Sequence, residues 1–590
     1  MVAAGLDPAV WPADEVDDSL RRVSAGAVSG IADEAMVAGS TGPFAQLAGR
    51  KVLEAGGSAA DAVVAVAVAQ VALAAGAWVS CAGVFAMVHC QARTGRVDSL
   101  SAGFATFARE ADPGTIPRPP QPSGRTALVP GFVAGIGAAH QRFGRLPWAD
   151  LFGPAIWVAE RGFPVGRGRE RQFGLRQDVL SRTPEGREIF FGDRGRLPRQ
   201  GEMFRQPAFA RTLRGIAAGG PEWMYQGPWA REFVGVVGRE GGKAVLEDLA
   251  SYQPAWDEPV TADFHGHRVH ALGGPGRGGA ALALTLNLAD QAGLADPAED
   301  PESLYWMIQI ARQVHPGGLG VTEHGPGYAS GLWQDMRAAG GAVGAGAVPG
   351  SHSDFVLAVD RDGNVAAACH SVNTSLWGST GLFAGGVSIP DAAGSPSFAL
   401  TRPAPGAHVT IPASPVIALR DGRPVLAAGN VGIAGNAVAL QCLHAILGAG
   451  RDIAETVAGP LFHGPGFMTG DSVNTPAEAA SAVARRLNGT GASPQLASAA
   501  RRAREAGIPA GQRWAAMLAG FPQVVEDRFD PALLAAVQDR GQPLRARPAT
   551  DPLMPRGIWG GIVISGASPR LSGARTPFTD GRIEGIGHKP

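Results

Sequence analysis

Apolar residues recur along the first hundred residues with spacings that predict two helices followed by a pair of strands. The helical pattern covers residues 43–54 and 59–74, and the Gly-Gly pair between them is typical of a helix end. A hydrophobic run at residues 84–90 predicts a strand, and residues 96–100 predict its partner across a short polar turn. The chain ahead of residue 36 has no such pattern, so we expect a loosely packed lead-in there.

The second half of the chain carries short apolar runs separated by polar turns, a pattern typical of antiparallel hairpins. Residues 355–359 and 365–372 predict two strands, and residues 414–419 and 424–428 predict two more. An apolar helix is predicted over residues 434–447. Antiparallel hairpins with helices before and after them predict an α+β fold in which helices cover sheets.

Composition and charge narrow the class of protein without giving a function. Apolar residues make up 45% of the chain and charged residues 17%, so a large core can form and wholesale disorder is excluded. The formal net charge is −1 with both signs mixed along the chain, which argues against a nucleic-acid partner. The most apolar stretch, residues 59–77, contains Asp61 and Gln70 and predicts a buried helix rather than a membrane span.

The N-terminal segment and the cysteines bear on the compartment and on metal binding. The first twenty residues are acidic and interrupted by proline, unlike the basic start and apolar run of an export signal. The four cysteines show no Cys-x-x-Cys spacing, so neither a zinc site nor a disulfide framework is predicted. We therefore expect a cytoplasmic protein with no metal, no cofactor and no membrane partner, acting on a small-molecule substrate.

One serine follows the most flexible-looking stretch of the sequence, the glycine- and alanine-rich residues 338–350. If the peptide bond between His352 and Ser353 breaks, the hydroxyl and a new α-amine lie on the same residue. An α-amine has a pKa of about 7.7–8.0, so it can act as the base near neutral pH without a histidine. Such a nucleophile also needs a polar group to orient it and backbone N–H groups to hold an oxyanion.

Ser371 and Asn373 are candidates for the orienting groups. They lie two residues apart on the second predicted strand of the hairpin, so we expect them to point the same way. Serine, asparagine and glycine beside a strand are also ordinary turn formers, so these residues alone leave both interpretations open.

Several separated segments extend this argument to most of the chain. They stand here as residues 53–62 (LEAGGSAADA), 140–148 (HQRFGRLPW), 154–156 (PAI), 162–165 (GFPV), 354–364 (DFVLAVDRDGN), 371–374 (SVNT), 414–415 (SP) and 421–425 (DGRPV). In order and spacing they resemble the γ-glutamyltransferase family from about residue 37 to residue 585. The resemblance implies an N-terminal-nucleophile (Ntn) hydrolase with a four-layer αββα fold. It further implies a zymogen that cleaves itself into a heterodimer of a large subunit, residues 1–352, and a small subunit, residues 353–590, which together form one domain.

The same resemblance implies roles for individual residues. The nucleophilic threonine of the family falls on Ser353, and serine supports the same chemistry. The second threonine of the family falls on Ser371, which would orient the nucleophile, and its asparagine falls on Asn373, which would hold the amine. The paired glycines of the oxyanion loop fall on Gly432 and Ile433, so only one of them is kept.

The sequence departs from the family where the glutamyl group is gripped. Gly103 stands where the family has an arginine for the α-carboxylate, and Asp391 is out of register with the acid that holds the α-amine. Ile411 and Pro412 replace a pair of serines, and Arg277 is a candidate to approach a substrate carboxylate instead. Losing two charge-assisted contacts costs about 3–6 kcal/mol, so we expect no preference for glutamyl substrates.

Several functions remain open on this basis. A kept nucleophile with a lost glutamate grip is similar to a group of relatives that hydrolyse a carbon–carbon bond next to a carbonyl during synthesis of 4-alkylproline antibiotic precursors. An amide hydrolase or acylase on a non-glutamyl substrate is the main alternative. A true γ-glutamyltransferase or glutathione hydrolase and an unprocessed, non-catalytic scaffold are the others.

Overall fold

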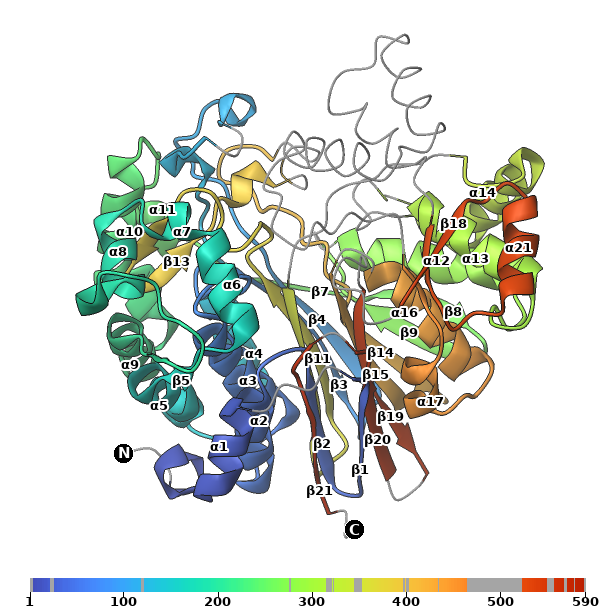
Figure 1. Ribbon diagram of the computed structural model, residues 1–590, viewed down its shortest axis with the longest axis horizontal. Coiled ribbons are helices and arrows are strands. Elements are labelled where there is room, and N and C mark those ends of the chain that lie inside the picture. The colour runs from blue at the N-terminus through green and yellow to red at the C-terminus, as the bar shows by residue number, and fades with distance from the viewer. Residues whose placement is uncertain are drawn as a thin grey trace.

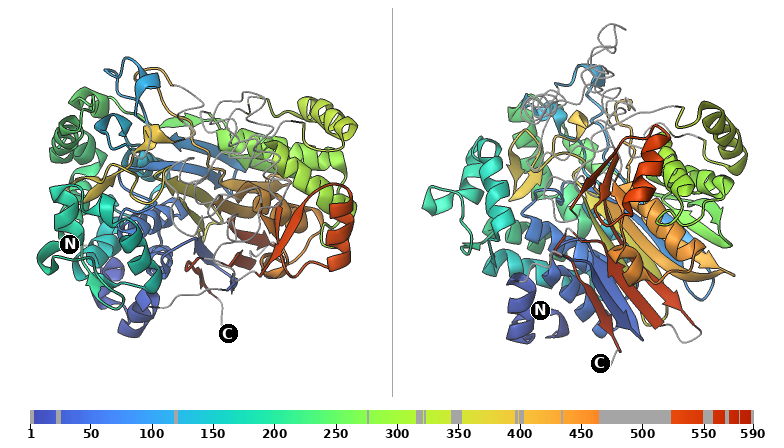
Figure 2. Two further views of the ribbon diagram at one scale, coloured as in Figure 1. Left: turned by 45° about the horizontal axis from the view of Figure 1, so that its top comes forward. Right: turned by 45° about the vertical axis from the view of Figure 1, so that its right-hand side comes forward.

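The computed structural model describes most of the chain and contains two large sheets flanked by helices (Figure 1). The residues it describes are 4–21, 26–117, 121–274, 277–314, 321, 323–343, 353–395, 398, 403–432, 435–463, 523–548, 557–566, 570–577 and 579–587. Both sheets run through the middle of the molecule, and helices lie on the outer side of each (Figures 1 and 2).

The first sheet, here called sheet 1, contains seven strands among the described residues. Its order is β21 (Ile583–Ile586), β2 (Ala35–Gly39), β10 (Ser353–Val359), β11 (Val365–Ser371), β3 (Val84–Gln91), β4 (Arg96–Ala102) and β7 (Ala255–Asp257). All of its neighbouring strands are antiparallel.

Sheet 2 likewise contains seven strands within the described part of the chain. Its order is β1 (Val28–Ala32), β20 (Arg570–Arg575), β19 (Ile558–Ser565), β15 (Arg423–Val431), β14 (Val416–Arg420), β9 (His267–Ala271) and β8 (Val260–Phe264). Smaller sheets pair β5 (Phe163–Pro164) with β6 (Met203–Phe204), β12 (Leu382–Ala384) with β13 (Val387–Ile389), and β17 (Gln523–Glu526) with β16 (Phe462–His463) and β18 (Leu544–Arg547).

Each large sheet has its own group of helices. On the outer side of sheet 1 lie α1 (Ala13–Arg21), α2 (Pro43–Glu54), α3 (Ala59–Ala74), α4 (Phe132–Phe143), α5 (Gly153–Arg161), α6 (Arg167–Leu175), α7 (Gln177–Leu180), α8 (Pro184–Phe190), α9 (Pro207–Tyr225), α10 (Pro228–Arg239) and α11 (Leu246–Ala250). On the side of sheet 2 lie α12 (Arg277–Ala292), α13 (Pro301–Val314), α14 (Pro326–Ala339), α16 (Gly435–Leu443), α17 (Ile453–Ala458) and α21 (Pro531–Asp539). The predicted mixed fold of helices and sheets is therefore confirmed.

The two sheets face each other across a shared core. Phe355 and Leu357 of β10, Ile417 of β14, and Ala427 of β15 are among the buried residues of one cluster, with side chains contributed by both sheets. Because side chains alternate along a strand, the remaining residues of β10 point to the other side, toward α2 and α3. Sheet 1 is therefore buried on both faces around β10.

The apolar segment at residues 59–74 is a core helix. α3 begins with a capping box in which Ser58 and Asp61 each bind the other's backbone N–H, at 3.0 and 2.9 Å. Its residues are apolar on all sides and almost all buried, as expected for a helix enclosed by other helices and a sheet. Among the described helices none is long and apolar enough to cross a membrane.

The expectation of a loosely packed lead-in was wrong. Residues of the segment before β1 are buried in the core: Leu6 is 1% exposed, and Trp11 and Val16 are each 7% exposed. The ring of Trp11 lies 5.8 Å from that of Phe44 on α2, so the early chain covers the outer side of this helix. These apolar residues are too far apart in sequence to form a recognisable periodic pattern.

Candidate active site

A tight hairpin places the candidate nucleophile opposite its candidate partner. β10 and β11 pair over their full lengths, with Ser353 opposite Ser371 at one end and Val359 opposite Val365 at the other. Asp360 holds the turn, because its carboxylate accepts hydrogen bonds from the backbone N–H groups of Asp362 and Asn364, both at 3.0 Å. The turn sets the register, and the register brings the two serines together.

The two serines are joined by a hydrogen bond. Ser353 Oγ donates to Ser371 Oγ over 2.8 Å, and the backbone N–H of Asn373 donates to the same Oγ over 2.9 Å. Two donors occupy both lone pairs of the Ser371 hydroxyl, which fixes its position. Ser353 is partly buried and Ser371 is 5% exposed. The two candidate serines are therefore in direct contact, and the orienting role of Ser371 stays a prediction.

Asn373 reaches the site by a route that differs from the one we expected. β11 ends at Ser371, so the alternation of a strand does not apply to Asn373. Its backbone is instead left-handed, with a φ of 53°, a conformation that asparagine tolerates better than most residues. This turn brings the N–H of Asn373 back onto Ser371 and leaves its side chain 8% exposed at the end of the strand.

Asp354, the residue after the candidate nucleophile, anchors β10 on the side of the helices. Its carboxylate is fully buried and accepts hydrogen bonds from Ser40 Oγ at 2.7 Å, Thr41 Oγ1 at 2.8 Å and Trp78 Nε1 at 2.8 Å. Ser40 also accepts the N–H of Phe355 at 3.0 Å. Burial raises the pKa of Asp354 to about 6, against the effect of the three hydrogen bonds.

Asp354 is a site residue that the sequence argument missed. Its signal was the presence of a charged residue in an otherwise apolar strand directly after the candidate nucleophile. Burying an unpaired charge costs free energy, so a charged residue in such a strand predicts hydrogen-bond donors around its side chain.

The candidate oxyanion loop approaches from sheet 2. Gly432 follows the last residue of β15 and has a φ of +85°, which suits glycine at this turn. Three residues earlier, a Cβ on Gly429 would lie 2.8 Å from Cβ of Phe355, so glycine allows the two sheets to approach closely beside Ser353. Ile433 and His352 lie outside the described residues, as does the side chain of Arg277, which opens α12.

Gly103 stands in a place where no larger residue fits. A Cβ on Gly103 would lie 2.5 Å from the carbonyl oxygen of Val409 and 3.2 Å from Cγ1 of Ile411. The carbonyl oxygen of Gly103 accepts a hydrogen bond from the hydroxyl of Tyr252 at 2.5 Å. Val409 and Ile411 therefore leave room only for glycine at the position where the family resemblance places an arginine.

Apolar side chains lie beside Ser371 on the neighbouring strand β3. Val84, the strand partner of Ser371, belongs to a cluster of buried residues that we call the apolar cluster. Its members are Val84, Ala86, Phe104, Ile116, Leu128, Leu272, Ala392, Ala393, Phe398, Val409 and Ile411. Ile411, one of the two residues that replace the family's serines, is 2% exposed within it.

The carboxylate of Asp391 accepts hydrogen bonds that connect two loop segments. Asp391 is 1% exposed, and its carboxylate accepts hydrogen bonds from the hydroxyl of Thr374 and from the backbone N–H of Ser379, the latter at 2.9 Å. These bonds tie the segment after Asn373 to the segment after β13. Asp391 therefore stabilises the loop that carries Asn373.

Two other titratable groups on β11 belong to the core. Burial raises the pKa of the Cys369 thiol to about 12, so it stays protonated and unreactive at neutral pH. Burial lowers the pKa of His370 to about 3, and its Nε2 lies 2.8 Å from the side-chain oxygen of Gln70. Neither group provides a base for Ser353.

Comparison with known proteins identifies the relatives of this chain. Residues 45–315 match the family model described as gamma-glutamyltranspeptidase. A glutathione hydrolase proenzyme from Pseudomonas aeruginosa is 38% identical over 166 residues, which are 28% of this chain and 29% of that relative. Over these residues the chain is similar to the gamma-glutamyltranspeptidase family. The alignments to this relative and to glutathione hydrolases from Arabidopsis thaliana and Schizosaccharomyces pombe span 29%, 46% and 28% of those relatives, so the activity of the whole protein is taken up below as a proposal.

Solved structures extend the likeness in fold to nearly the whole chain. The crystal structure of cephalosporin acylase from Bacillus halodurans matches with a TM-score of 0.74 and 20% identity, and the match covers 95% of this chain and 97% of that one. A structure of LmbA matches with a TM-score of 0.69 and 19% identity, over 96% of this chain and 100% of that one. At these identities the likeness concerns the fold. Together with the family match it supports the predicted enzyme class, which is taken up below as a proposal.

Proposed function

We propose that this protein is a self-processing Ntn hydrolase of the gamma-glutamyltranspeptidase type, with Ser353 as its nucleophile. The observation that carries the proposal is the hydrogen bond of 2.8 Å from Ser353 Oγ to Ser371 Oγ, at the first residue of a buried strand. Cleavage between His352 and Ser353 would free the α-amine of Ser353 as the base for the reaction. We further propose that the two sheets and their helices form the four-layer αββα sandwich of Ntn hydrolases.

The strand order supports a stable heterodimer after cleavage. In sheet 1, β10 and β11 of the proposed small subunit lie between β2 and β3 of the proposed large subunit. In sheet 2, the strands of the small subunit likewise lie between β1 and β9 of the large one. Backbone hydrogen bonds across these boundaries would hold the two chains together without a covalent link.

The proposed reaction begins with attack of Ser353 Oγ on a substrate carbonyl carbon, while the α-amine takes the hydroxyl proton. Ser371 holds the nucleophile and Asn373 holds the amine. Backbone N–H groups at Gly432 and Ile433 bind the oxyanion of the tetrahedral intermediate. Collapse of the intermediate breaks the bond to the leaving group, which takes the proton from the ammonium, and water then hydrolyses the acyl-Ser353 ester.

The surroundings of the site favour a substrate other than a glutamyl compound. The position of Gly103 has no room for a side chain, Asp391 is engaged in the loop, and Ile411 lies in the apolar cluster. Apolar surroundings of this kind favour an apolar group beside the reacting carbonyl. We propose hydrolysis of a carbon–carbon bond next to a carbonyl, in a 4-alkylproline-type antibiotic precursor. Amide hydrolysis of a non-glutamyl acyl group is the second candidate, because the apolar cluster suits an acyl chain equally well.

The test compares substrate classes on the processed protein. We expect little or no product from γ-glutamyl-p-nitroanilide or glutathione, because the glycine at position 103 cannot supply the bidentate contact of an arginine. A glutathione hydrolase at equal concentration serves as the positive control, and Ser353→Ala gives the background. Turnover of γ-glutamyl-p-nitroanilide comparable to the control would overturn the proposed loss of glutamate binding.

Product analysis then separates the two candidates. Mass spectrometry of reactions with an apolar N-acyl amide and with a β-dicarbonyl-type carbon–carbon substrate identifies which bond is broken. Cleavage of the carbon–carbon substrate with loss of activity in Ser353→Ala supports the first candidate. Cleavage of the amide alone supports the second.

A further inference from the structure

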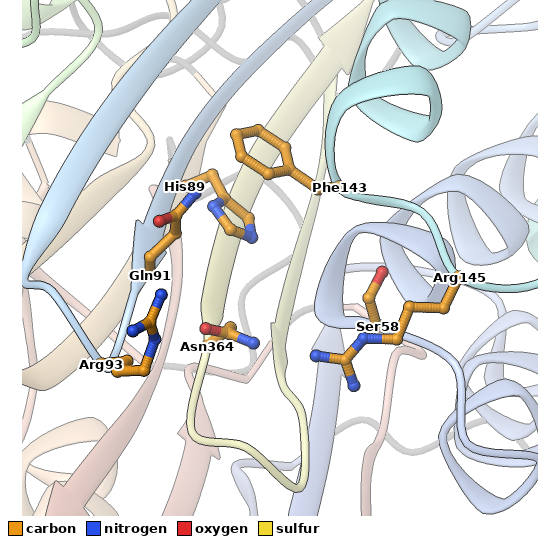
Figure 3. Close-up of a pocket in the computed structure, with 7 residues that line it drawn as sticks. All are labelled: Ser58, His89, Gln91, Arg93, Phe143, Arg145 and Asn364. Carbon is orange, nitrogen blue, oxygen red and sulfur yellow. The ribbon is translucent and has the colours of Figure 1, made fainter.

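A polar cavity lies at the turn end of the β10–β11 hairpin, away from Ser353 (Figure 3). Its volume is about 190 Å³, and its polar lining consists of Ser58, His89, Gln91, Arg93, Arg145 and Asn364. Asn364 belongs to the hairpin turn, seven residues from Ser371. With a rise of about 3.3 Å per residue, the length of β11 puts roughly 20 Å between the cavity and the serines. The proposed reaction therefore makes no use of this space.

His89 is the buried polar group of the cavity. His89 is 3% exposed, and its ring stacks on the ring of Phe143 with 3.7 Å between the ring centroids. Figure 3 shows the ring reaching into the space between Gln91, Asn364 and Ser58. Its Nδ1 is buried and has no hydrogen-bond partner among the described residues. Buried polar groups in proteins are nearly always paired, so this ring indicates a partner that occupies the cavity.

The charges around the cavity favour an anion. Two arginines line it, and no acidic side chain does. Arg145 is partly neutralised, because its Nη2 lies 2.5 Å from Asp362 and 3.6 Å from Asp360. Arg93 is exposed and forms no ion pair within the described part of the chain. Burial lowers the pKa of His89 to about 3, and the positive charges of Arg142 and Arg145 act in the same direction.

We propose that this cavity binds the carboxylate or phosphate group of a small metabolite. Arg93 supplies the unpaired cation, and the side chains of Gln91, Asn364 and Ser58 supply neutral hydrogen-bonding groups, as in other oxyanion sites. The volume holds several water molecules but is smaller than that of pockets for drug-sized ligands, so the ligand is a small one. Because the site includes the turn that sets the register of Ser353 and Ser371, binding stabilises the hairpin that carries the proposed nucleophile.

Calorimetric titration of the purified full chain with inorganic phosphate, with acetate and with neutral acetamide tests this proposal. We expect saturable binding of at least one of the two anions and none of acetamide; the tighter anion identifies the class of ligand. Arg93→Gln is expected to weaken that binding about tenfold or more, the value of one charge-assisted contact. Arg570→Gln removes an exposed arginine at the start of β20 and should leave the affinity unchanged.

Two further variants separate this site from the proposed active site. His89→Phe keeps an aromatic ring against Phe143 and removes both ring nitrogens, so it should abolish binding; if it does not fold, Arg93→Gln decides alone. Ser353→Ala should bind the anion as tightly as the unchanged chain. The absence of saturable binding by both anions, or equal affinity in Arg93→Gln, would overturn the proposal and leave the proposed hydrolase untouched.

Discussion

Replacing Asp354 with asparagine should remove one component of the pH dependence of stability. Asp354 is the second residue of β10, and its fully buried carboxylate accepts three hydrogen bonds, from Ser40, Thr41 and Trp78. Burial raises its pKa from 3.8 to about 6, and the nearby charge of Asp580 adds to the shift. Asparagine has nearly the same shape but does not titrate.

The sign of the effect follows from proton binding. Between about pH 4 and pH 6 the folded protein keeps a proton on Asp354 that the unfolded chain has already released. The stabilisation from this group is therefore fully present below pH 3.8 and is lost as the pH rises through about 6. A shift of about two pKa units corresponds to about 3 kcal/mol in the free energy of unfolding.

Urea unfolding followed by tryptophan fluorescence, at several pH values between 4 and 7, measures this component. The free energy of unfolding of the unchanged chain minus that of Asp354→Asn should fall by about 3 kcal/mol across this range. If the curves of Asp354→Asn and the unchanged chain run parallel, the carboxylate is not buried as described.

Two further predictions concern the nucleophile and the place of the missing arginine. Ser353→Ala should abolish both self-cleavage and turnover, which would be seen as one intact band on a denaturing gel and no product. Ser371→Ala should slow both steps about tenfold, the effect of losing one hydrogen bond, and should lower the melting temperature by no more than a few degrees. A normal rate in Ser353→Ala would require another nucleophile. Gly103→Ala should lower the free energy of unfolding by about 1–3 kcal/mol, because its Cβ would lie 2.5 Å from the carbonyl oxygen of Val409. Gly235→Ala, in α10 where a Cβ would meet nothing within 4 Å, should be neutral or stabilising; equal effects of the two substitutions would contradict this packing.

Local patterns in the sequence predicted many of the helices and strands. The predicted helices at residues 43–54 and 59–74 coincide with α2 and α3, and the predicted hairpin strands coincide with β10 and β11 to within two residues. These elements have complete apolar periods and clear ends, so short-range information is sufficient for them. The pairing of β1 with β20, and of β2 with β21, joins the two ends of the chain and has no local signal.

The candidate site divides in the same way. The register of Ser353 with Ser371 follows from the turn at Asp360 and Asn364, which the sequence displays. The left-handed backbone of Asn373 depends on a turn beyond the end of the strand. The hydrogen bonds that Asp354 accepts come from residues that are distant in sequence, such as Trp78. The crowding at Gly103 depends on Val409 and Ile411, some three hundred residues further along the chain. The roles of Ser353, Ser371 and Asn373 in catalysis remain predictions.

The subunit boundary between residues 352 and 353 is the central claim of this account, and it determines where the base of the reaction comes from. Intact-mass measurement and N-terminal sequencing of freshly purified full-length protein test it most directly. The account predicts two polypeptides, residues 1–352 and residues 353–590, and a new N-terminus that begins Ser-Asp-Phe-Val. Active protein that consists of a single intact chain, or a new N-terminus at another residue, would contradict it.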